Sequence, residues 1–158
     1  MKDRRKTRSD VVVAGFGSPH GDDQVGWRVV ATLARRPNLA ARVLAVYEAT
    51  QLVEDLKACR KLIVVDGCRT GSPVGTITRL RWPDPRIARR HNHSTHGVGV
   101  CGALQLAERL GRMPADVEII GVEVRDCAPE PEMSSEVLQA MFELEALIFS
   151  ELREVVHA

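Results

Sequence analysis

Apolar residues along the chain follow two patterns: short unbroken runs, and stretches in which they recur every three or four positions. The unbroken runs, bounded by glycine, proline or charged residues, predict buried strands, and the recurring pattern predicts amphipathic helices. The predicted strands are residues 11–16, 43–47, 61–67, 75–82 and 117–124. The predicted helices run from Gln24 to Pro37, through 52–56, over 98–110, and from Ser134 or Ser135 to Val155, with a polar loop at 86–95.

Strands and helices alternate along the chain, which is the order expected of an α/β protein. We therefore predict a three-layer sandwich, in which a largely parallel central sheet with room for one antiparallel strand carries helices on both faces. The runs at 11–16 and 61–67 are apolar throughout, as strands covered on both faces should be. The run at 75–82 alternates between apolar and polar residues, which indicates a half-exposed strand at a sheet edge.

The length of 158 residues fits one domain with its own core. We assign this domain to residues 11–158 and expect the basic segment 1–10 to be a disordered tail. No apolar run approaches the roughly 20 residues that cross a bilayer, so we predict no membrane partner. The net charge of +1 gives no general argument for nucleic acid, and the local cluster Arg86, Arg89 and Arg90 lacks interleaved aromatic residues.

The four cysteines are widely spaced and form no C-x-x-C pair. This spacing suggests neither a zinc knuckle nor a disulfide framework, and a reducing cytoplasm is the simplest location. Cys68 lies close to Asp66 in sequence, as Ser94 does to His96, but proximity alone is weak support for a nucleophile. Most cysteines are small buried packing residues.

Asp23, Asp66 and His96 each lie at a predicted junction where a strand ends or a helix begins. If strands 11–16 and 61–67 are neighbours, the loops that follow them share one edge of the sheet. Two carboxylates and an imidazole meeting there would suit a divalent first-row ion, with nickel, zinc and cobalt all chemically plausible.

The aspartates also have simpler interpretations. Asp22 or Asp23 is well placed to cap the helix that follows, although one cap cannot occupy both carboxylates. Asp66 before Gly67 could be only a turn former. The turn Gly15-x-Gly17 resembles a phosphate cradle, but two adjacent carboxylates at the helix start would repel an anion.

Short motifs follow one another along the chain. They are Gly15-Phe16-Gly17-Ser18 with Asp22-Asp23, Val64-Val65-Asp66-Gly67 with Pro73-x-Gly75, Ser94-Thr95-His96-Gly97, and Ile119-Ile120-Gly121-Val122-Glu123. In this order they resemble the motifs of the hydrogenase maturation proteases, which trim the C-terminus of the large subunit of nickel–iron hydrogenases. The resemblance covers about residues 11–148; Ser18 stands where the family usually has asparagine, and the loop to the aspartates is a residue short.

The resemblance implies a metal-dependent endopeptidase whose partner is a hydrogenase large-subunit precursor. It implies that Asp23, Asp66 and His96 are both the metal-contacting and the catalytic residues, and that no separate cofactor-binding residues are needed. The ion would be Ni²⁺ presented by the substrate, and Zn²⁺ or Cd²⁺ could take its place in vitro. The alternatives from the residues are a non-catalytic nickel-sensing module and a divergent small hydrolase with another substrate, such as peptidyl-tRNA.

Overall fold

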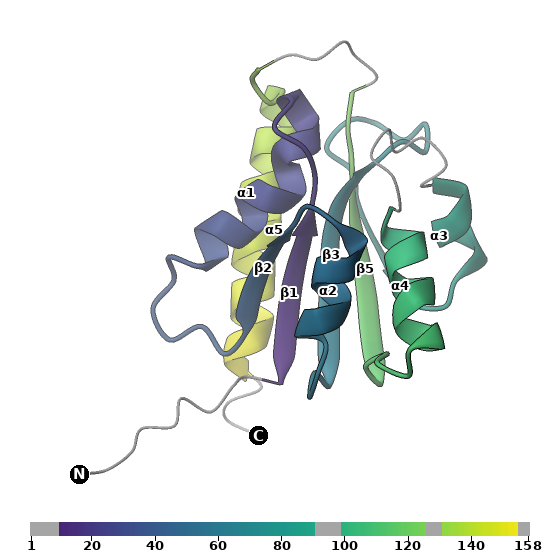
Figure 1. Ribbon diagram of the computed structural model, residues 1–158. Coiled ribbons are helices and arrows are strands. Elements are labelled where there is room, and N and C mark those ends of the chain that lie inside the picture. The colour runs from purple at the N-terminus through teal and green to yellow at the C-terminus, as the bar shows by residue number, and fades with distance from the viewer. Residues whose placement is uncertain (1–9, 91–98, 126–130, 155–158) are drawn as a thin grey trace.

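The computed structural model describes residues 10–90, 99–125 and 131–154, and Figure 1 shows their arrangement. In chain order the strands are β1 (Val11–Phe16), β2 (Arg42–Val46), β3 (Lys61–Cys68), β4 (Ile77–Arg81) and β5 (Asp116–Glu123). The helices are the 3₁₀ helix η1 (Gly21–Gln24), α1 (Val25–Leu33), α2 (Ala49–Asp55), α3 (Pro85–Arg90), α4 (Val100–Arg109) and α5 (Ser135–Glu154).

The strands form one sheet in the order β2-β1-β3-β5-β4. The pairs of β1 with β2, β1 with β3, and β3 with β5 are parallel, and β4 runs antiparallel to β5 at the sheet edge. The predicted parallel sheet with one antiparallel strand is thus confirmed. The two predicted central strands, β1 and β3, are direct neighbours, with Val13 aligned with Ile63.

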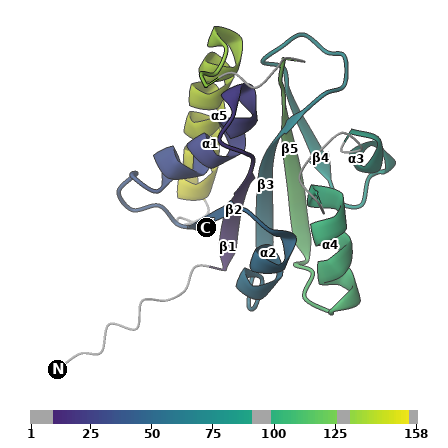
Figure 2. The same ribbon diagram turned by 45° about the horizontal axis from the view of Figure 1, so that its top comes forward.

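Helices cover both faces of the sheet and give the predicted three layers. In Figures 1 and 2, α1 and α5 lie together on one face, and α2, α3 and α4 lie on the other. Alternate residues of the central strands supply the two cores because successive side chains of a strand point to opposite faces. Val13 and Ile63 pack toward α1 and α5, whereas Val12 and Leu62 pack toward α2 and α4.

The predicted polar loop 86–95 is wrong over its first residues, because α3 occupies Pro85–Arg90. Asp84 starts this helix by accepting the backbone N–H of Arg86 at Oδ1, at 2.9 Å, and Pro85 suits the first helical position. Ile87 anchors the helix in the core with 1% of its surface exposed. The only apolar residues of the segment 86–95 are Ile87 and Ala88, and two adjacent residues give no period from which the helix could be predicted.

The predicted tail, residues 1–10, is described only at Asp10, whose backbone oxygen accepts the N–H of Arg60 at 2.7 Å. The remaining residues of that segment lie outside the described part of the chain. Within the described residues, no helix combines the length and the apolar character that crossing a membrane requires.

Candidate functional site

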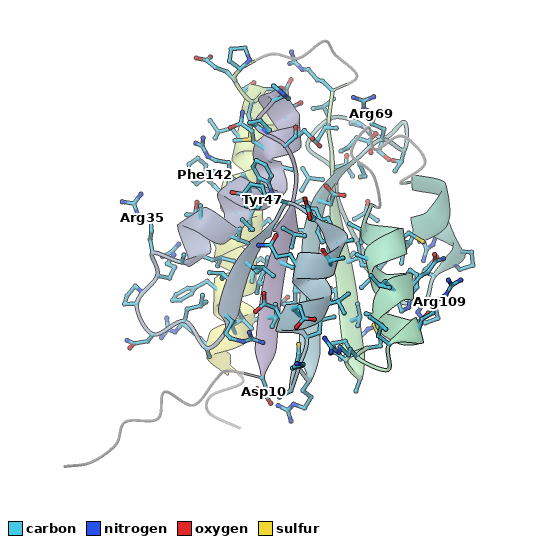
Figure 3. The ribbon with its side chains drawn as sticks, in the orientation of Figure 1. Asp10, Arg35, Tyr47, Arg69, Arg109 and Phe142 are labelled. Carbon is cyan, nitrogen blue, oxygen red and sulfur yellow. The ribbon has the colours of Figure 1, made fainter. Side chains whose placement is uncertain are left out.

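The carboxyl ends of β1, β2, β3 and β5 meet at one edge of the sheet because these strands are parallel. This edge is uppermost in Figure 1, and α1 starts there. Figure 3 places Arg69, which follows β3, at this end of the molecule and Asp10, which precedes β1, at the opposite end. In open α/β sheets, ligands bind at this kind of edge.

Two glycines bring the start of α1 into direct contact with the central strands. A Cβ atom on Gly26 would lie 2.1 Å from the backbone oxygen of Phe16 and 2.5 Å from that of Val65. A Cβ on Gly15 would lie 2.1 Å from the backbone oxygen of Gly26. Only glycine fits at these two positions. The close approach holds the turn before α1, which carries the two aspartates, against the end of β3.

Asp22 is a structural residue and not the helix cap considered from the sequence. Its carboxylate accepts the backbone N–H of Ser134 at 2.6 Å, the Ser134 hydroxyl at 3.0 Å and the backbone N–H of Arg125 at 3.0 Å. Neither Asp22 nor Asp23 caps a helix, because the N-cap positions of η1 and α1 are His20 and Gln24, and neither makes a side-chain capping bond. Asp22, 5% exposed, instead joins the turn to the end of β5 and the start of α5.

Replacing Asp22 with alanine is expected to destabilise the fold by about 2 kcal/mol, because the backbone N–H groups of Arg125 and Ser134 lose a charged acceptor. The Ser134→Ala variant, which removes only the hydroxyl bond, should lose about 1 kcal/mol. Urea denaturation of both variants measures the difference. Equal stability of the Asp22→Ala variant and the parent protein would contradict this structural role.

Asp23 points the other way, toward β3. Its Oδ1 lies 3.7 Å from the place that a Cβ on Gly67 would occupy, so the carboxylate is beside the residue that follows Asp66. The Asp23 backbone oxygen accepts the N–H of the buried Ser18 at 3.1 Å, which closes the turn. The structure therefore brings Asp23 and Asp66 together, although 43 positions separate them in the sequence.

The Asp66 carboxyl lies near the end of β3 and has a pKa raised to about 8. Partial burial is the largest cause, because it disfavours the charged form, and the negative charge of Asp23 adds to it. The backbone N–H of Gly67 acts in the opposite direction by donating to the carboxylate. Near neutral pH, Asp66 therefore carries a proton for most of the time unless a cation neutralises the pair.

His96, the third predicted site residue, lies outside the described residues, as do His91, His93 and Ser94. Over the described ranges, histidine, cysteine and acidic side chains nowhere gather in threes around a possible metal ion. The structure thus brings together two of the predicted site residues, and the role of His96 stays a prediction.

The other candidate groups have structural partners. The buried Cys68 thiol lies 3.6 Å from Oε2 of Glu123, to which it donates. The Arg86 guanidinium pairs with Asp84, with Nη2 2.6 Å from Oδ2. Glu123 itself is a buried carboxylate at this edge that the sequence interpretation treated only as a strand residue. The signal that could have identified it is an acidic residue near the carboxyl end of a predicted strand, which is also the position of Asp66.

These features define an α/β protein with a pair of carboxylates at the carboxyl edge of its parallel sheet, an arrangement that can hold a divalent cation or share a proton. Residues 28–151 match the sequence profile of the HycI family, the hydrogenase maturation proteases. The chain belongs to this family, and we conclude that it is a hydrogenase maturation endopeptidase. Asp66 and His96 lie within the matched residues, whereas Asp23 lies just before them.

Solved structures of other hydrogenase maturation proteases have similar folds. The hydrogenase maturating endopeptidase HybD from E. coli is 22% identical, with a TM-score of 0.76, over 92% of this chain and 93% of that one. The hydrogenase 2 maturation peptidase from a Thaumarchaeota archaeon is 29% identical, with a TM-score of 0.65, over 90% and 97%. HycI from Thermococcus kodakarensis is 17% identical, with a TM-score of 0.72, over 93% and 94%. No curated protein matches the sequence significantly.

Proposed function

We propose that this protein is a nickel-dependent endopeptidase that removes a C-terminal extension from the precursor of a nickel–iron hydrogenase large subunit after nickel has been inserted. The observation that carries the proposal is the pairing of Asp23 with Asp66 at the carboxyl edge of the sheet. The negative charge of Asp23 disfavours the charged form of Asp66, and a cation between the two carboxylates would offset this effect. Membership of the maturation protease family supplies the reaction class.

In this proposal Asp23, Asp66 and His96 contact the nickel ion, which the substrate carries. The two carboxylates suit a divalent cation because Asp23 Oδ1 lies beside Gly67, the residue after Asp66, and the charge of Asp23 acts on the Asp66 carboxyl. When bound, the ion would polarise the scissile carbonyl or lower the pKa of an attacking water. The chain's own contribution is to orient the ion and to hold a proton on Asp66 until the ion displaces it.

Cation affinity is expected to depend on pH through Asp66. Because the pKa of Asp66 is about 8 without a cation, binding must release a proton below that pH. We expect the affinity for Zn²⁺ or Cd²⁺, used in place of nickel, to fall up to about tenfold for each pH unit below about 8. Calorimetry in two buffers of different ionisation enthalpy measures both the affinity and the released proton. Affinity independent of pH over this range would contradict the role of Asp66.

The test of the proposed function is incubation with a large-subunit precursor, once loaded with nickel and once without it. We expect mass spectrometry to show a shortened subunit only from the nickel-loaded precursor. A loaded precursor that stays intact here, while another maturation protease cuts it, would overturn the proposal for that partner.

The same experiment separates the non-catalytic alternative. A nickel-sensing module would bind the loaded precursor and leave its mass unchanged, whereas an endopeptidase leaves a shorter product and a released peptide.

A further inference from the structure

Glu123, the last residue of β5, is a carboxylate with 4% of its surface exposed and no assigned function. Its Oε1 accepts the backbone N–H of Thr70 at 2.7 Å and that of Gly71 at 3.0 Å. Its Oε2 accepts the Thr70 hydroxyl at 2.7 Å, and the Cys68 thiol lies 3.6 Å from the same oxygen. These donors compensate the cost of burying the charge.

The backbone of Glu123 holds the other end of the same segment, residues 69–76, which we name the β3–β4 loop. The Glu123 N–H donates to the backbone oxygen of Thr76 at 2.9 Å, and its backbone oxygen accepts the N–H of Gly75 at 2.8 Å. The loop also bends at Gly71, whose φ of +85° favours glycine. One residue of β5 thus fixes both ends of the loop that follows the strand carrying Asp66.

Glu123 and Val124 also lie beside the residues of β3 that follow Asp66. Across the β3–β5 pair, Asp66 is aligned with Gly121 and Cys68 with Glu123. The N–H of Val124 donates to the backbone oxygen of Cys68 at 3.0 Å. A Val124 methyl group lies 3.0 Å from the place of a Cβ on Gly67, on the side where Asp23 Oδ1 lies at 3.7 Å. A shift of Glu123 would therefore be transmitted through 67–71 to the carboxylate pair.

We propose that Glu123 is a positioning residue, which holds the end of β3 and the β3–β4 loop so that Asp66 faces Asp23 at the distance a cation requires. The inference rests on the proposed function, since it assigns the pair to cation binding. Buried groups that orient metal-contacting residues typically change affinity or activity by about 10- to 100-fold when removed.

The test compares Glu123 with a second buried glutamate. Glu145 is 2% exposed and accepts two hydrogen bonds from Arg36, at 2.6 and 2.8 Å, between the α1 end and α5. Both Glu123→Ala and Glu145→Ala should lower the melting temperature. Only Glu123→Ala should lower Cd²⁺ affinity and the kcat for the nickel-loaded precursor, each by at least about tenfold, with KM changed less than about threefold.

The conservative variant separates positioning from a loss of packing. Glu123→Gln keeps Oε1 as the acceptor for Thr70 and Gly71, so we expect it to restore kcat and Cd²⁺ affinity to within about threefold of the parent protein. The Thr70→Val variant keeps the backbone donor and removes only the hydroxyl. It should fold and lose about threefold in Cd²⁺ affinity. This variant therefore tests the positioning role of Glu123 if Glu123→Ala does not fold.

Parent-like Cd²⁺ affinity in a folded Glu123→Ala variant would overturn the inference, and so would an equal loss of affinity in Glu145→Ala. If Glu123→Ala does not fold, unchanged affinity in Thr70→Val would overturn it. Failure of the proposed function gives a different result, in which the parent protein leaves the loaded precursor uncut. The Cd²⁺ comparison does not use cleavage, so it still decides whether Glu123 positions the carboxylate pair.

Discussion

The Asp66→Asn variant is expected to lose at least about 100-fold of the cleavage activity and yet to be more stable than the parent protein near neutral pH. In the proposed mechanism, the Asp66 carboxylate supplies charge that holds the cation during cleavage. Such charge is worth several kcal/mol in metal-assisted hydrolysis, and each 1.4 kcal/mol is about tenfold in rate. Asparagine is similar in size and keeps an oxygen that can accept the N–H of Gly67.

The gain in stability follows from the sign of the pKa shift. The folded Asp66 has a pKa of about 8, above the value of about 3.9 expected in the unfolded chain. Between these two values the folded state binds more protons, so the stability contributed by this group falls as pH rises through the window. The penalty is absent below about pH 4 and complete above about pH 8.

Because Asp66 is only partly buried, we expect Asp66→Asn to gain about 2 kcal/mol above about pH 8, and nothing near pH 4. This gain corresponds to a melting temperature higher by about 4 to 8 °C. Thermal unfolding with a chelator present measures it at both pH values. A variant that is less stable at the higher pH would contradict the raised pKa.

Asp116→Asn is the matched control for activity. Asp116 is the first residue of β5 and so lies at the amino ends of the parallel strands, away from Asp66. It pairs with Lys61 and Arg81. Its replacement should leave cleavage unchanged and lower stability by no more than about 1 kcal/mol. Full cleavage by Asp66→Asn would remove Asp66 from the site.

The Gly26→Ala variant is expected to lose about 4 kcal/mol of stability, the largest effect on folding predicted here. The added methyl group would overlap the backbone oxygens of Phe16 and Val65, at 2.1 and 2.5 Å, and backbone atoms of central strands have little room to move. Since Gly26 lies in the first turn of α1, which follows Asp23, the displacement of α1 also carries Asp23 away from Asp66.

Ala31→Gly in the exposed face of the same helix provides the control. It should lower stability by about 1 kcal/mol, the usual cost of glycine within a helix, and leave cleavage unchanged. Chemical denaturation compares the two variants. If Gly26→Ala were no less stable than Ala31→Gly, the close contact between α1 and the central strands would be refuted.

Much of the fold could be predicted from the sequence because the signals are local. The run Val11–Val13 and the run Leu62–Val65 are apolar at every position, and all these residues are buried, as expected of strands covered on both faces. The α/β class followed from the alternation of such runs with helical periods. Helix α3 was missed because a helix of six residues whose apolar side chains after Pro85 are only Ile87 and Ala88 leaves no period to detect.

The sequence by itself also placed Asp23 and Asp66 at the ends of elements, where side chains are free to bind ligands. Whether these two carboxylates meet depended on β1 and β3 being neighbours, which no local pattern specifies. The order of strands in the sheet makes them neighbours and so brings the two carboxylates together. The resemblance of the ordered motifs to the maturation proteases was confirmed by the family match.

Only the tertiary structure showed that Asp22 and Asp23 have different roles, Asp22 as an acceptor for the ends of other elements and Asp23 as a neighbour of Asp66. Asp22 binds Ser134, 112 positions away, and Glu123 binds Thr70, 53 positions away, so both carboxylates are structural through contacts that the chain forms only when folded. Periodicity records which face of an element is buried, because that depends on residues a few positions apart. The partner of a buried polar side chain depends on which loops the sheet brings together, and this is set by the packing of the whole domain.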